Sequence, residues 1–92
     1  MSREKKPAQY PAFAAVLRDV IEPTGLRVNA WVERCKVDNA TMSYWLNGRR
    51  LPSPETWPLL ESALADAGLD WRRVHTALAR EWSPRLREEV AP

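Results

Sequence analysis

The sequence predicts an all-α fold: a compact bundle of five helices, with room for a short sixth helix near the C-terminus. Apolar residues recur at spacings of three and four along most of the chain, which is the period of a helix that buries one face. Alternation of β-branched residues with period two, the mark of a half-buried strand, is absent. With 92 residues the chain has enough material for one small domain and not for two.

The first helix is expected over residues 11–21. Pro11 suits its first turn, because the N–H that proline lacks would have no partner there. The segment from Glu22 to Gly25 ends it. Its buried face consists of apolar residues three and four positions apart: Phe13, Val16, Leu17, Val20 and Ile21.

Two short helices joined by a tight turn are expected next, over residues 27–35 and 39–46. Lys36 and Val37 form the turn, and Asp38 is a suitable N-cap for the second of these helices. Gly48 is suited to the left-handed conformation that ends it. The residues expected to point inward are Leu26, Trp31, Val32 and Cys35 on the first helix and Met42, Trp45 and Leu46 on the second.

The remaining helices are expected after a basic loop over residues 49–52. Ser53 and Pro54 begin a helix that runs to about Ala67, and Pro58 predicts a kink or a start nearer Trp57. A fifth helix follows over residues 71–82, with Asp70 as its N-cap. The Ser-Pro pair at 83–84 repeats the start signal, so residues 83–92 are expected to be a tail or a short sixth helix.

Positive charge is concentrated in two parts of the chain, although the net charge is only +2. Residues 1–10 are expected to form a basic, flexible tail, and they carry Arg3, Lys5 and Lys6 against Glu4. Residues 27–50 carry five basic side chains against two acidic ones, whereas residues 51–92 carry five against seven. Attraction of phosphate is a local effect, so the expected pair of short helices is a candidate site for nucleic acid.

The segment from Thr41 to Arg50, with sequence TMSYWLNGRR, resembles the helix-turn-helix of the lambda-repressor-like family, also called the Xre or Cro/C1-type family. The resemblance covers roughly residues 11–80, with one helix before the pair and two after it, so residues 11–82 are expected to form one helix-turn-helix domain. It implies a DNA-binding transcriptional regulator that places the helix over 39–46 in the major groove, usually as a homodimer on a two-fold site. Helix 5 and the segment after Ser83 are the expected dimer surface.

The resemblance also implies roles for individual residues. The expected readers of base edges are Asn39, Ala40, Ser43 and Tyr44, and the expected contacts to phosphate come from Arg27, Thr41, Asn47, Arg49 and Arg50. This division is chemically reasonable. Asparagine can pair with adenine and the alanine methyl can touch the thymine methyl, whereas arginine on phosphate positions a protein without reading sequence.

The chain departs from the family pattern in the first half of the motif. Lys36 stands in the turn where the family usually has glycine, and Val32 is bulkier than the usual alanine at the crossing of the two helices. Arg27 and Val28 replace the usual Ser or Thr cap and the glutamine that binds phosphate. The alternative interpretation is therefore a protein-interaction adaptor that has kept the fold and lost DNA binding. Its partner surface would be Trp71, Arg72, His75 and Trp82.

An enzyme is not expected, because no nucleophile–base pair, phosphate-binding glycine loop or paired carboxylates stand out. No metal ion or cofactor is expected either, since His75 has no ligand partners at suitable spacing. Cys35 is the one cysteine and is expected to be a buried apolar residue. A single cysteine, with no membrane-span pattern and no signal-peptide pattern, predicts a reducing bacterial cytoplasm, with the protein on the nucleoid when it binds DNA.

Overall fold

The computed structural model describes residues 9–90, with side chains described as far as Trp82. Five α-helices, and no strand, lie in this part of the chain. They are α1 (Pro11–Ile21), α2 (Val28–Cys35), α3 (Asn39–Leu46), α4 (Trp57–Asp66) and α5 (Trp71–Val90). A short 3₁₀ turn, η1 (Glu22–Thr24), follows α1. The predicted all-α class is confirmed.

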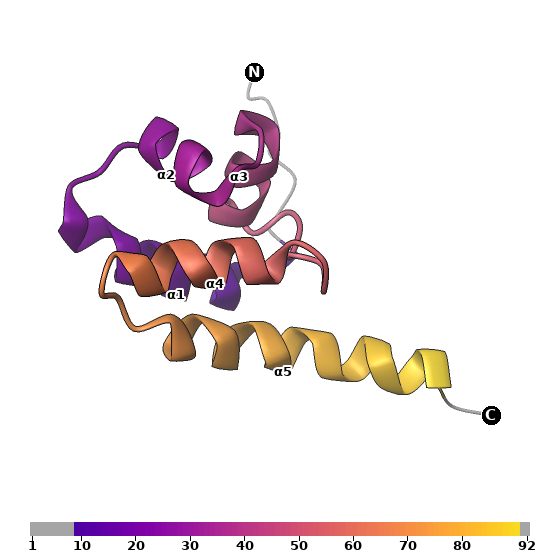
Figure 1. Cartoon of the computed structure of the whole chain (residues 1–92). Helices are drawn as coiled ribbons and strands as arrows, with labels where there is room; N and C mark the ends of the chain where they lie inside the picture. Colours follow the sequence, from indigo (N-terminus) through magenta and orange to yellow (C-terminus); the bar gives the residue numbers. More distant parts are fainter. Residues whose placement is uncertain (1–8, 91–92) are drawn as a thin grey trace, which may run out of the picture.

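The helices form a bundle in which α2 and α3 lie together at one side. Helix α1 packs against α3 and α5, and α2 packs against α3 and α4. In Figure 1, α2 and α3 are seen at the top and α5 at the bottom, with α1 and α4 between them. The second half of α5 continues past the other helices (Figure 1). The pair α2–α3 therefore has an outer face that none of the other helices covers.

Aromatic side chains from separate helices dominate the core. Trp31 of α2 and Trp45 of α3 are 1% and 2% exposed, and Phe13 of α1 is fully buried. Trp57 joins them from α4, while Trp71 and Trp82 are half-buried against the same cluster. A buried tryptophan removes a large apolar area from water, which is how a chain of this length stabilises one core.

The predicted limits of α1, α2 and α3 are confirmed. Pro11 occupies the first turn of α1, and Gly25 ends η1 in the left-handed conformation at φ 71°. Asp38 caps α3, and Gly48 follows it with φ 71°. Each of these helix ends is determined by a side chain or a backbone preference of a residue at that end. The local sequence was therefore sufficient to predict it.

Helix α4 begins at Trp57 rather than at Pro54, as the position of Pro58 had indicated. Residues 54–56 form a turn in which Ser53 and Thr56 bond reciprocally. The Ser53 N–H donates to Thr56 Oγ1 at 2.7 Å, and the Thr56 N–H donates to Ser53 Oγ at 3.1 Å. Pro58 then lies in the first turn of α4, where its missing N–H leaves no broken hydrogen bond.

Two details differ from the expectations. First, α5 continues without a break through Ser83 and Pro84 to Val90, so no separate sixth helix begins at Ser83. The Ser-Pro start signal is overridden, although proline in a helix interior costs a backbone hydrogen bond and a steric contact, about 3 kcal/mol. Second, Leu26 was expected to point inward but is 38% exposed. It precedes α2 in the extended segment after Gly25, where no other helix covers it.

The turn between α2 and α3 stores backbone strain at Lys36. This residue adopts φ 59° and ψ 41°, the left-handed conformation at the position where the resembled family has glycine. Among the residues that the structure describes, Lys36 is the one non-glycine residue with positive φ. A residue with a Cβ pays about 1–2 kcal/mol for this conformation.

Replacing Lys36 with glycine is expected to raise the free energy of unfolding by about 0.5–1 kcal/mol. The gain is smaller than the full strain, because glycine also makes the unfolded chain more flexible. Chemical denaturation of Lys36→Gly and wild type measures it. Lys36→Ala is the matched control: it removes the same charge but keeps the Cβ, so it should give no such gain. If Lys36→Gly and Lys36→Ala were equally stable, the inferred backbone strain at Lys36 would be wrong.

Candidate nucleic-acid interface

Helix α3 has one buried face and one exposed face. Met42, Trp45 and Leu46 are buried in the core. On the opposite side Asn39, Ala40 and Ser43 are exposed. Tyr44, at the edge of this exposed face, is half-buried. The four residues expected to read bases are therefore on the surface of one short helix, although Tyr44 is only partly accessible.

Asp38 holds the start of α3. Its Oδ1 accepts a hydrogen bond from the backbone N–H of Thr41 at 2.8 Å, as expected of an N-cap. Hydrogen bonds from the Thr41 side chain and from the Thr41 N–H hold the pKa of Asp38 below its ordinary value of 3.8. The ionised carboxylate thus stabilises the end of the helix where backbone donors are unpaired.

Asp38→Ala is expected to lower the melting temperature at neutral pH, and the difference from wild type should shrink in acid. A carboxyl group with a lowered folded-state pKa contributes stability that is present above its unfolded pKa and is lost as the pH falls through the folded value. The relevant window is therefore below about pH 4. Melting curves between about pH 7 and pH 2.5 test this. Asp38→Asn keeps a capping oxygen without the titration, so a pH-independent difference between wild type and this variant would contradict the assignment.

The C-terminal end of α3 is fixed by α1 and by the segment before it. Tyr10 was expected in the flexible tail over residues 1–10, but it is buried and its N–H donates to the Gly48 carbonyl at 2.8 Å. Residues 1–8 of that tail lie outside the described residues. Arg18 of α1 donates from Nε to the Leu46 carbonyl at 2.7 Å and from Nη2 to Asn47 Oδ1 at 2.9 Å. A cation at the end of a helix satisfies unpaired carbonyls and interacts favourably with the helix dipole. Both ends of α3 are therefore held in place by specific hydrogen bonds.

Asn47, one of the expected phosphate contacts, uses its side chain within the protein. Its Oδ1 accepts from Arg18, and its Nδ2 donates to Ser43 Oγ at 3.1 Å. One hydrogen of the Nδ2 amide remains for another partner. No local pattern predicts this arrangement, because Arg18 and Asn47 are 29 positions apart in the chain.

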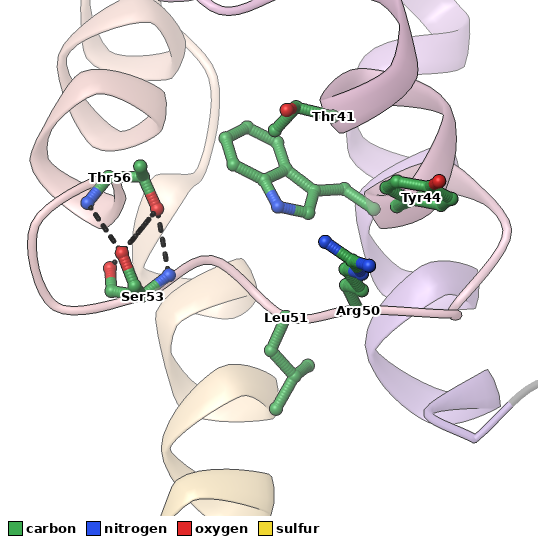
Figure 2. A pocket seen from close by; sticks show the side chains of 7 residues that line it. Thr41, Tyr44, Arg50, Leu51, Ser53 and Thr56 are labelled. Atoms are coloured by element: carbon green, nitrogen blue, oxygen red, sulfur yellow. Dashed lines mark hydrogen bonds between the residues drawn. The ribbon is translucent and has the colours of Figure 1, made fainter.

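The basic loop after α3 presents two arginines that differ in their surroundings. Both Arg49 and Arg50 are exposed, and within residues 9–82 neither forms an ion pair with a carboxylate. The Arg50 guanidinium lies 4.5 Å from the centroid of the Tyr44 ring, which is a cation–π contact. The two side chains lie next to each other in Figure 2. Arg50 therefore links the loop to the exposed face of α3.

A shallow hollow of about 170 Å³ separates α3 from the turn before α4. Arg50 and Tyr44 line one side of it, and Ser53 and Thr56 line the other, where their mutual hydrogen bonds are drawn in Figure 2. Thr41, expected to contact phosphate, also lines this hollow. A cation and hydroxyl groups, which can bind phosphate oxygens, border the hollow together with the apolar side chains of Trp45 and Leu51.

The start of α2 is less polar than its expected role requires. Arg27 is exposed at the N-cap position, but its side chain makes no capping hydrogen bond there. Val28, in the first turn, is 43% exposed. A free arginine at this position can contact phosphate, whereas valine has no group that can.

The other chemically active side chains have structural surroundings. The ring of His75 lies 5.3 Å from that of Trp57, tilted by 40°. Burial raises the pKa of the Cys35 thiol to about 11, so the thiol is neutral at physiological pH. The described residues contain no cluster of three or more His, Cys, Asp or Glu side chains that could hold a metal ion. Over the same part of the chain, none of the helices is both long and apolar enough to cross a membrane.

Comparison of the chain with models of protein families, with curated proteins and with solved structures finds no match.

Proposed function

We propose that the chain is a sequence-specific regulator of transcription that binds double-stranded DNA through a helix-turn-helix formed by α2 and α3. One observation carries the proposal: α3 exposes Asn39, Ala40 and Ser43 on one face, directly before the exposed Arg49 and Arg50. An eight-residue helix is about 12 Å long, so it fits the major groove without extending far beyond it.

The flanking groups support this assignment. Arg49, Arg50 and Arg27 would contact the phosphates on either side of the groove and so position α3 on the duplex. Thr41 and Asn47 would assist at the two ends of α3. The bases would be read by Asn39, Ala40, Ser43 and the exposed edge of Tyr44.

A homodimer fits this mode of binding, because one short helix makes few base contacts and a two-fold site doubles them. The part of α5 that extends past the bundle in Figure 1 is the proposed dimer surface. Occupancy of the site in the bacterial nucleoid would block or recruit polymerase.

Salt titration of binding to a duplex of mixed sequence tests the proposal. Fluorescence anisotropy should show an affinity that falls steeply with salt, with a log–log slope of about −0.9 for each phosphate contact. Absence of any salt-dependent binding to the duplex would contradict the assignment.

The adaptor is the second candidate, and the exposed Leu26 and Val28 favour it. These two apolar side chains lie beside Arg27, where a DNA-binding chain would offer hydrogen-bond donors to phosphate. An adaptor would show no salt-dependent DNA binding and would co-purify with a protein partner. Of the expected partner surface, Trp71, His75 and Trp82 are half-buried and only Arg72 is exposed. That partner would therefore be lost when Arg72 is substituted.

A further inference from the structure

A chain of hydrogen bonds leads from α1 to an exposed side chain of α3. It begins at Arg18, whose guanidinium reaches the Leu46 carbonyl and Asn47 Oδ1 at 2.7 and 2.9 Å. It ends at Ser43 Oγ, which lies 3.1 Å from Asn47 Nδ2. We call these three side chains, Arg18, Asn47 and Ser43, the Arg18 relay.

The chemistry of arginine fixes the direction of the relay. A guanidinium carries only donors, so Asn47 must turn its oxygen toward Arg18. The opposite orientation of the amide would place an NH₂ group against the guanidinium. The amide nitrogen of Asn47 therefore faces Ser43 and donates to it.

This direction determines what Ser43 can offer to a ligand. A hydroxyl has one O–H donor and two acceptor lone pairs, and Asn47 occupies one of the lone pairs. Among the side chains that the structure describes, none accepts a hydrogen bond from Ser43 Oγ. Ser43 is exposed, so its O–H is available to a partner outside the protein. Without the relay, serine would donate or accept with little preference.

We propose that Arg18 is a positioning residue that determines base specificity: through Asn47 it makes Ser43 a hydrogen-bond donor in the major groove. Ser43 then selects a base that presents an acceptor, which is N7 or O6 of guanine, N7 of adenine or O4 of thymine. Cytosine is disfavoured, because its exposed N4 donor can use only the one lone pair of Ser43 Oγ that Asn47 leaves free. This inference rests on the proposed function and adds a residue of α1 to it.

The experiment compares binding of wild type and variants to the site that wild type selects from random duplex DNA, and to all single-base changes of that site. Ser43→Ala identifies the base position that Ser43 reads. At that position wild type should bind the acceptor bases on the order of ten-fold more tightly than cytosine. Arg18→Met, which removes every donor, should reduce this preference to less than about three-fold.

Asn47→Asp provides the sharper test. The carboxylate still accepts from Arg18, but it accepts from Ser43 as well and so reverses the last bond of the relay. Ser43 then offers a lone pair to DNA. The affinity of the variant for a site with cytosine at that position should therefore rise relative to its affinity for sites with guanine or thymine there. The carboxylate keeps the contact with Arg18, so Asn47→Asp can test the relay even if Arg18→Met does not fold.

Two controls separate the relay from a merely structural role. Arg73→Met removes one positive charge and an ion pair to Asp19 on α1, without touching α3, so its base preferences should match those of wild type. In the Ser43→Ala background, Arg18→Met should cause no further change at the position that Ser43 reads, because the two residues act through one contact.

The outcomes distinguish the inference from the proposed function. If wild type selects no sequence at all, both fail. If wild type selects a site and neither Arg18→Met nor Asn47→Asp changes the preference at the Ser43 position, the relay is overturned while the proposed function stands. A uniform loss of affinity for all bases in both variants would also overturn it, because that is the effect of a structural role alone.

Discussion

Replacing Gly48 with alanine is expected to lower the free energy of unfolding by about 3 kcal/mol, through backbone strain and a lost hydrogen bond. Gly48 has φ +71°, and a Cβ added there would lie 2.8 Å from the Tyr10 carbonyl oxygen and 3.2 Å from Ala14 Cβ. The Tyr10 backbone would have to move, which would break its N–H bond to the Gly48 carbonyl. Denaturation followed by circular dichroism measures the loss.

Two other glycines are matched controls for this variant. Gly25 and Gly68 have φ of +71° and +73°, but a Cβ added at either would meet no atom within 4 Å. Gly25→Ala and Gly68→Ala should therefore cost only the conformational strain, about 1–2 kcal/mol. If Gly48→Ala were no more destabilising than these two, the close approach of Tyr10 to the end of α3 would be wrong.

The Arg49→Ala/Arg50→Ala double variant is expected to lose most of its affinity for duplex DNA. Two phosphate contacts disappear, so the slope of log affinity against log salt should become shallower by about 1.8. At about 0.1 M salt, the affinity should be on the order of fifty-fold lower. Anisotropy titrations at several salt concentrations measure both quantities.

The control is Arg72→Ala/Arg73→Ala, which removes two adjacent, exposed arginines from the start of α5, together with the ion pair of Arg73 to Asp19. Helix α5 lies on the far side of the bundle from α3 in Figure 1, so the slope of this variant should equal that of wild type. If the two double variants lose equal affinity, only net charge matters. The loop after α3 would then have no special role in docking.

The parts of the fold that the sequence predicted well are those whose cause is local. Asp38 caps α3 with its own carboxylate. Pro58 lacks an N–H and therefore lies in the first turn of α4, so the helix begins at Trp57. The turn at Lys36 was expected where the resembled family has glycine, and Lys36 adopts the left-handed conformation there, with φ 59°. In each case the residue that determines the feature lies within a few positions of it.

The features that the sequence did not predict depend on residues far apart in the chain. Arg18 reaches Leu46 and Asn47 across 28 and 29 positions, and nothing in the local pattern around Arg18 indicates this. Leu26 has the apolar character of a core residue, but its exposure depends on which helices pass over it. The roles of Asn39, Ala40, Ser43 and Tyr44 at a base edge remain predictions, which a DNA complex would test.

Selection from random duplex DNA with the purified wild-type protein is the decisive experiment for base reading by α3. We expect an enriched sequence with two-fold symmetry, in half-sites about one helical turn apart, at roughly 10 base pairs from centre to centre. An enriched sequence without symmetry would contradict the dimer. If no sequence is enriched over the starting pool, the proposed reading of bases by α3 is wrong.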